Sequence, residues 1–106
     1  MEKIMNEIKQ FVDERDWNQF HTPDCLAKSI SIEAGELLEC FQWNSDQYDK
    51  EHVLEELADV MVYCMQMSIA LDVDMEDIIR KKMIKNAKKY PVDKAKGNSL
   101  KYTEFK

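Results

Sequence analysis

Residues 57–71 contain a single charged side chain, Asp59, in a run that otherwise consists of Leu, Ala, Val, Met, Tyr, Cys, Gln, Ser and Ile. A run of this length and composition, without glycine or proline, predicts a helix that is buried on nearly every side. A carboxylate in such surroundings costs free energy unless a positive charge or hydrogen-bond donors meet it. The run therefore predicts a helical fold and raises the question of what neutralises Asp59.

The rest of the chain is equally poor in helix breakers, because its 106 residues include only two glycines and two prolines. Apolar residues at helical spacing predict four helices, over residues 2–15, 23–43, 49–71 and 75–90. Thr22 and Pro23 mark the start of the second helix, Asp74 caps the fourth, and Pro91 ends it. We expect one all-α helical domain over residues 1–91 and a tail without regular periodicity over residues 92–106.

The net charge of −6 conceals an uneven distribution along the chain. Residues 1–79 hold 19 acidic and 5 basic side chains, whereas residues 80–106 hold 10 basic and 2 acidic ones. An acidic body repels a DNA backbone, so we expect no nucleic acid partner, but cations and phosphates can bind side by side. The alternative is that the basic segment only balances the acidic body within the fold.

Segments that direct a chain to a membrane or to an oxidising compartment are not evident. No apolar run reaches the length of a membrane span, and the N-terminal residues do not resemble a signal peptide. The three cysteines are widely spaced and form no C-x-x-C pair. We therefore expect a cytoplasmic protein with reduced, mostly buried cysteines and no membrane partner.

Two pairs of carboxylates stand at i, i+3 spacing on the second and third predicted helices. Glu33 occupies a position where the apolar series of its helix requires a hydrophobic residue, and Glu36 follows one turn later. Glu56 and Asp59 repeat this spacing. If the two helices pack side by side, the four carboxylates raise one another's pKa values unless a divalent cation joins them. Ligation by oxygen alone favours Mg²⁺ or Mn²⁺ over Zn²⁺.

The alternative for either pair is a solvated helix face, which is the commonest reason for such a spacing. The positions of Glu33 on an apolar stripe and of Asp59 in its chargeless run favour the metal site. On the third helix we expect Leu54, Leu57, Met61, Met65 and Ile69 to form the main buried side. The strip opposite keeps the hydrogen-bonding groups of Tyr63 and Gln66 beyond Asp59, which suits the wall of a cleft.

The fourth predicted helix has Asn86 on a stripe where a hydrophobic residue is expected. A buried asparagine needs hydrogen-bond partners, which either a bound nucleobase or a neighbouring helix supplies. Tyr90 ends the same stripe and is a further candidate for substrate binding. Lys82 and Lys89 flank this face and are candidates for phosphate contacts, because the chain has no glycine-rich phosphate loop.

Aromatic side chains gather near two predicted helix ends, where they more often pack as caps than bind ligands. Trp17 and His21 stand in the first connection, and Trp43 ends the second helix. Near Asn86 and a metal site, these side chains are candidates for a nucleobase pocket.

The combination of these motifs resembles a known family. "EAGELLECFQW" followed by "EELADVMVY" is similar to the E-x-x-E…E-x-x-D signature of the MazG-like, all-α nucleoside triphosphate pyrophosphohydrolases. The resemblance extends to "RDWNQFHTP", "KKMIKNAKKYP" and "KYTE", so it covers almost the whole chain. The dCTP pyrophosphatase branch is the most similar, although Ala87 departs from its basic positions after Asn86.

This resemblance implies an Mg²⁺-dependent hydrolysis of a (deoxy)nucleoside triphosphate, dCTP or a similar nucleotide, to the monophosphate and pyrophosphate. It implies a four-helix bundle completed by dimerisation, as a homodimer or a dimer of dimers that forms a homotetramer. The resemblance assigns the metal ligands and catalytic acids to Glu33, Glu36, Glu56 and Asp59. It assigns the nucleoside pocket to Trp17, His21, Trp43, Tyr63 and Asn86, and the phosphate contacts to Lys82 and Lys89.

Two alternatives to this function stay open at this point. One is a non-catalytic helical interaction module whose acidic cleft docks a basic partner. The other, within the same enzyme class, is a hydrolase of dUTP or of phosphoribosyl-ATP.

Overall fold

The structure is a computed structural model that describes residues 1–106, and it contains helices and turns but no strand. The chain divides into two compact units, residues 1–73 and residues 74–106. The helices of the first unit are α1 (Glu2–Glu14), the 3₁₀ helix η1 (Trp17–Phe20), α2 (Pro23–Glu39) and α3 (Lys50–Ala70). Those of the second are α4 (Met75–Lys89), α5 (Val92–Ala95) and the 3₁₀ helix η2 (Tyr102–Glu104). The predicted all-α class is therefore confirmed.

Three of the four long helices begin where the sequence predicts, at the N-cap residues Thr22, Asp49 and Asp74. Thr22 is the extended N-cap of α2 and Pro23 its first residue. The Asp49 carboxylate accepts hydrogen bonds from two backbone N–H groups in the first turn of α3, over 3.1 and 3.4 Å. The Asp74 carboxylate accepts one over 2.9 Å in the first turn of α4. Each contact satisfies N–H groups that the helix itself leaves without a partner.

Helix α2 ends at Glu39, and the prediction that it continues to Trp43 is wrong. After Glu39 the backbone tightens, because the N–H groups of Cys40, Phe41 and Gln42 bond to carbonyls only three residues back. The Asn44 side chain then accepts hydrogen bonds from the next backbone N–H groups, over 3.0 and 2.9 Å. These local bonds replace the fourth-neighbour bonds that a longer helix needs.

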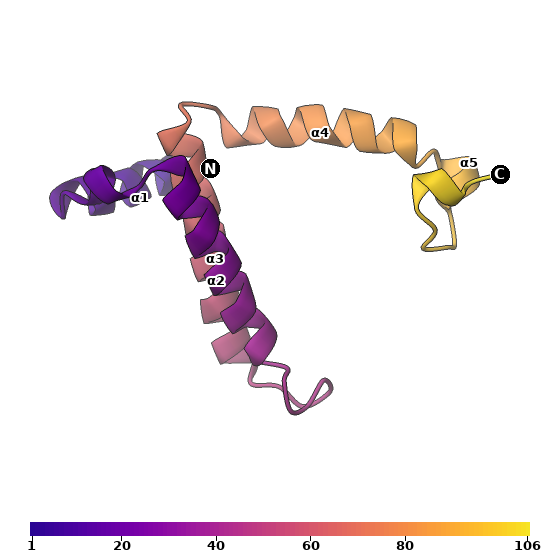
Figure 1. Cartoon of the computed structure of the whole chain (residues 1–106), viewed down its shortest axis with the longest axis horizontal. Helices are drawn as coiled ribbons and strands as arrows, with labels where there is room; N and C mark the ends of the chain where they lie inside the picture. Colours follow the sequence, from indigo (N-terminus) through magenta and orange to yellow (C-terminus); the bar gives the residue numbers. More distant parts are fainter. The chain divides into compact units, whose positions relative to one another are not determined.

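Helices α2 and α3 form an antiparallel hairpin whose helices lie side by side, and α1 packs on α3 (Figure 1). The core of this unit consists of Ile8, Val12, Leu26 and Met65, and Leu26 is only 1% exposed. The apolar stripe predicted for α2 is consistent with this packing, because Leu26 is buried and Glu33 is half-buried on the same stripe. The hairpin thus places the middle of α2 beside the first half of α3.

The side of α3 predicted as its main buried side is largely open to solvent. Leu54, Leu57 and Met61 are 51%, 40% and 49% exposed, and of this series only Met65 is fully buried. The physical reason is that α1 and α2 cover other parts of α3, so this apolar face has no neighbour within residues 1–73. Likewise Cys25 is exposed, whereas the other two cysteines are half-buried; all three are free.

Gly35 lies in the middle of α2, between Glu33 and Glu36 in the sequence. A Cβ atom at this position would meet no other heavy atom within 4 Å. The packing of the chain itself therefore does not require glycine here.

The second unit is held together by aromatic contacts around Tyr90. Its ring centroid lies 6.0 Å from that of Tyr102 and 5.7 Å from that of Phe105, both in edge-to-face geometry. The Lys89 ammonium lies 5.0 Å from the centre of the Tyr102 ring. Residues 92–106, which were predicted to be a tail without regular periodicity, contain the two short helices α5 and η2. The domain boundary at residue 91 stays a prediction. None of the helices combines the length and the hydropathy that a membrane span requires.

Candidate metal and nucleotide site

Three carboxylates meet between the two helices of the hairpin. Glu33 comes from α2, and Glu56 and Asp59 come from α3, with one oxygen atom of each within 4.8 Å of the others. The i, i+3 spacing places the last two on the same side of α3, and the antiparallel hairpin brings Glu33 to them. The sequence predicted this convergence for four carboxylates, and the structure brings three of them together.

Partial burial of Glu33 and Glu56 and mutual repulsion govern the electrostatics of this cluster. Asp59 is exposed, and the prediction that its helix is buried on nearly every side is wrong. Oε2 of Glu33 and Oε2 of Glu56 are both buried and have no hydrogen-bond partner. Burial raises the pKa of Glu33 above its ordinary value, and the hydrogen bond with Glu36 and the charges of Glu36, Asp59 and Glu56 raise it further. Glu33 therefore holds a proton more readily than a free carboxyl group does, and a bound cation would replace that proton.

Glu36 stands beside this cluster rather than in it. Its side chain is exposed, and it contributes to the raised pKa of the neighbouring Glu33. Its assignment as a fourth metal ligand stays a prediction.

The donor set of the cluster fits a hard divalent cation. All three groups offer carboxylate oxygen, and two buried oxygens have no partner within the protein. Unpaired buried carboxylate oxygens are costly, so the arrangement is unfavourable until a positive charge is added. Oxygen ligands of this kind suit Mg²⁺ or Mn²⁺ better than Zn²⁺.

His52 contacts one of these carboxylates from the side, and Cys40 contacts His52 in turn, an arrangement that was not predicted from the sequence. His52 Nε2 lies 3.2 Å from Glu56 Oε1, and His52 Nδ1 lies 3.7 Å from Cys40 Sγ. Burial, and next the charge of Glu56, raises the pKa of the Cys40 thiol, so this cysteine stays protonated beside the cluster. The only sequence signal was the i, i+4 spacing of His52 and Glu56.

A cavity of about 370 Å³ opens next to Asp59, and we call it the Trp17 cavity. Asp59, Tyr63 and Gln66 line it from α3, as expected for a strip that forms the wall of a cleft. Ile8 and Phe11 from α1 and Trp17 from η1 give it apolar and aromatic walls, and Glu7 of α1 adds a second acidic side chain. The Trp17 ring lies edge-to-face on Phe11 with 5.7 Å between the ring centroids. No motif in the sequence pointed to the α1 residues of this site.

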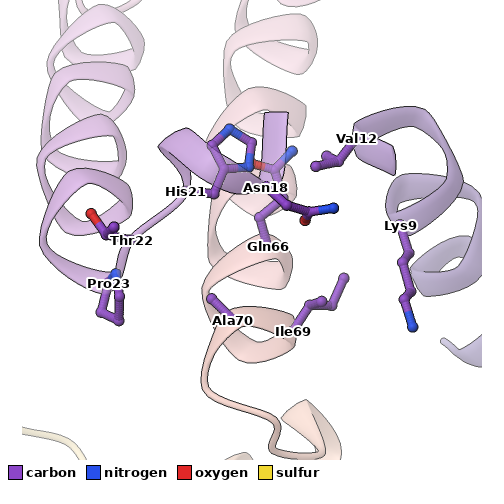
Figure 2. A pocket seen from close by; sticks show the side chains of 9 residues that line it. All are labelled: Lys9, Val12, Asn18, His21, Thr22, Pro23, Gln66, Ile69 and Ala70. Carbon is purple, nitrogen blue, oxygen red and sulfur yellow. The ribbon is translucent and has the colours of Figure 1, made fainter. Parts of the chain in front are cut away.

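A second cavity, of about 390 Å³, lies between α1, η1, the start of α2 and the end of α3, and we call it the His21 cavity (Figure 2). His21, Asn18 and Thr22 line it on one side and Gln66 and Ile69 on α3 line another. His21 lies edge-to-face to Trp17, with 6.3 Å between the ring centroids. Gln66 thus belongs to both cavities.

The remaining predicted substrate-binding residues lie elsewhere in the chain. Trp43 stands in the connection after α2, is 90% exposed and lines neither cavity. Lys82, Asn86, Lys89 and Tyr90 belong to the second unit. Asn86 is half-buried, and its Nδ2 contacts Met83 Sδ at 3.8 Å. Their assignment to a nucleotide stays a prediction.

Comparisons with known proteins agree with this fold and site. Residues 28–105 match the model of the MazG-like family. The chain is 35% identical to dCTP pyrophosphatase 1 of Mus musculus and to that of Homo sapiens, over 99% of this chain and 67% of each relative. It also superposes on the crystal structure of a pyrophosphatase from Archaeoglobus fulgidus with a TM-score of 0.75 and 36% identity, covering 86% of this chain and 92% of that one.

Fold and site together define an all-helical protein with a carboxylate cluster suited to a divalent cation. The chain belongs to the MazG-like family, near its dCTP pyrophosphatase branch.

Proposed function

We propose that this chain uses Mg²⁺ to hydrolyse a deoxynucleoside triphosphate, with dCTP as the expected substrate, to the monophosphate and pyrophosphate. The family and the relatives make the chain a nucleoside triphosphate pyrophosphohydrolase, and the choice of substrate and metal is our inference from the site. One observation carries it: a carboxylate cluster with two buried, unpaired oxygens adjoins an aromatic-lined cavity through Asp59.

The cluster explains why such a substrate needs a metal. Three carboxylates repel a polyphosphate, so the polyphosphate binds only if a positive charge lies between it and the carboxylates. Glu33, Glu56 and Asp59 would hold the cation, and Glu36 is the proposed fourth ligand. When bound, the cation supplies charge neutralisation for the phosphate oxygens and activates water.

The residues of the chain divide the remaining work. Glu33 or Glu36 is proposed to accept the proton of the attacking water, because Glu33 belongs to the cluster, Glu36 stands beside it, and its raised pKa makes the ionised Glu33 the stronger base. Trp17 and Tyr63 present aromatic faces for the nucleoside in the Trp17 cavity. Lys82 and Lys89 are proposed to stabilise the charge of the leaving pyrophosphate.

We further propose that the active form is a homodimer or a homotetramer. The exposed residues Leu54, Leu57 and Met61 follow one another at helical spacing on α3, and an apolar face of this kind is costly in water. A second copy that covers it completes the four-helix bundle of the fold class.

The decisive experiment is a panel of nucleotides, including dCTP, dUTP and phosphoribosyl-ATP, with pyrophosphate detection in the presence and absence of Mg²⁺. We expect dCTP turnover only with the metal, and a loss of about 10²–10³-fold in kcat for Asp59→Ala with helical content unchanged. Glu55→Ala, at an exposed acid on the same helix, is the matched control. Failure to turn over any of these nucleotides with Mg²⁺ favours the interaction module instead.

A further inference from the structure

Gln66 is one of two polar side chains that are buried in this fold, and its polar group has no partner. It is 8% exposed, and its Oε1 is buried without a hydrogen bond. Ser68, the other buried polar residue, is satisfied, because its hydroxyl donates to the Met65 carbonyl oxygen over 2.7 Å. Buried amide oxygens are almost always paired, so the unpaired oxygen of Gln66 needs an explanation.

The position of Gln66 supplies one. It lies on α3 one turn beyond Tyr63 and two turns beyond Asp59, and the three side chains line the Trp17 cavity together. Seven residues of helix span about 10 Å, which is comparable with the length of a nucleoside monophosphate. Figure 2 shows the side chain of Gln66 extending from α3 toward the segment that carries Asn18 and His21. A nucleotide with its phosphate at Asp59 and its sugar beside Tyr63 therefore presents its base to Gln66.

We propose that Gln66 determines base specificity, with its Oε1 accepting a hydrogen bond from an exocyclic amino group of the base. This inference rests on the proposed function and deepens it. A base with an amino group, such as cytosine, pairs with the buried oxygen. Uracil presents a carbonyl oxygen at the same place, so two acceptors face each other and both stay unpaired. Sites that pair with a donor of the substrate reject analogues that lack it.

The test compares dCTP with dUTP, because the two bases have the same size and differ in the C4 group that Gln66 is proposed to contact, together with the proton on the neighbouring N3. For the wild type we expect a higher kcat/KM with dCTP. Gln66→Met keeps the length of the side chain and removes its polar group. It should lower kcat/KM for dCTP by about 10–100-fold and leave kcat/KM for dUTP within about twofold of the wild-type value, because only dCTP loses a hydrogen bond.

Ser68→Ala is the matched control, since it removes a satisfied polar group from the same helix outside both cavities. We expect this variant to change kcat/KM for the two substrates by the same factor. If Gln66→Met lowers kcat/KM for both substrates equally, the inference on Gln66 is overturned while the proposed function stands. If the wild type prefers dUTP, the inference is overturned together with the choice of dCTP, whereas Mg²⁺-dependent hydrolysis of a deoxynucleoside triphosphate stands.

Binding of the product monophosphates separates the inference from the proposed function. If the wild type turns over no triphosphate, the proposed function fails, but calorimetry with dCMP and dUMP still tests Gln66. A preference for dCMP that Gln66→Met abolishes supports its role, whereas equal or absent binding overturns it. A further measurement needs no variant: the side-chain amide NMR signals of Gln66 in the wild type should shift with dCMP and not with dUMP.

Discussion

His52 Nε2 lies 3.2 Å from Glu56 Oε1, one turn along α3, and this contact leaves the buried Oε2 of Glu56 free for a cation. Of the two side chains, His52 is 53% exposed and Glu56 only 16%. The histidine therefore reaches in from solvent and fixes the orientation of a carboxylate in the cluster.

We predict that His52→Ala weakens Mg²⁺ binding by about tenfold, because groups that orient a metal ligand contribute this much to affinity. Calorimetric titration of the nucleotide-free protein with Mg²⁺ measures the effect directly. Lys50→Ala, in the first turn of the same helix, is the control that should leave the affinity unchanged. Equal affinities of the His52 variant and the wild type would show that Glu56 needs no support.

A second prediction concerns the stability of the metal-free protein and its pH dependence. A carboxyl group whose pKa is raised on folding holds its proton more tightly in the folded state. Stability therefore falls as the pH rises above the ordinary value of 4.5 toward the raised pKa of Glu33, and the loss persists at higher pH. Glu33→Gln removes this contribution and should be the more stable protein at pH 7.5.

We expect a melting temperature about 4 °C higher for Glu33→Gln at pH 7.5, since roughly 1 kcal/mol shifts a domain of this size by that much. Below the ordinary carboxyl pKa the two proteins should melt together. Addition of Mg²⁺ should stabilise the wild type and have little effect on the variant. Glu39→Gln, at an exposed acid of α2, serves as the control, and an equal gain there would rule out a specific role of the cluster.

Trp17 should contribute to nucleotide affinity rather than to the chemical step. Loss of one aromatic face that stacks on a base costs about 1–3 kcal/mol, so Trp17→Ala should raise KM about tenfold or more with kcat little changed. Steady-state kinetics with dCTP separates the two constants. Phe20→Ala, on the same 3₁₀ helix and 62% exposed, is the matched control. A fall in kcat alone would contradict this role.

The exposed apolar face of α3 predicts that assembly depends on Leu54. A glutamate at this position places a charge where a second copy would otherwise bury hydrophobic surface, so Leu54→Glu should shift the protein toward monomer. Light scattering coupled to size-exclusion chromatography measures the mass. Val92→Glu, at a 75% exposed residue of the second unit, should leave it unaltered. A wild type that is monomeric at all concentrations would remove the basis for this prediction.

The starts of the helices were predictable because they depend on local chemistry. Thr22, Asp49 and Asp74 each cap the helix that follows, and the residues involved are neighbours in the sequence. The position of Glu33 on the apolar stripe of α2, together with Asp59 in its chargeless run, also predicted that these two acids meet. Periodicity was informative here because both helices are long and regular.

The buried side of α3 was not predictable in the same way. An amphipathic pattern shows that a face is apolar but not what covers it, and in this chain Leu54, Leu57 and Met61 are exposed. The end of α2 and the position of Trp43 depend on hydrogen bonds within an irregular connection, which have no periodic signature. The contact of His52 with Cys40 joins two elements and follows only from their packing.

Gly35 determines how closely another molecule can approach the backbone of α2. Glycine in a helix interior costs about 0.5–1 kcal/mol relative to alanine, and no neighbour within 4 Å requires it here. Because Gly35 has no side chain, the peptide backbone itself forms the surface of the helix at this position. An atom of a bound molecule can therefore contact the main chain at Gly35 and lie closer to the helix axis than it could if a side chain were present.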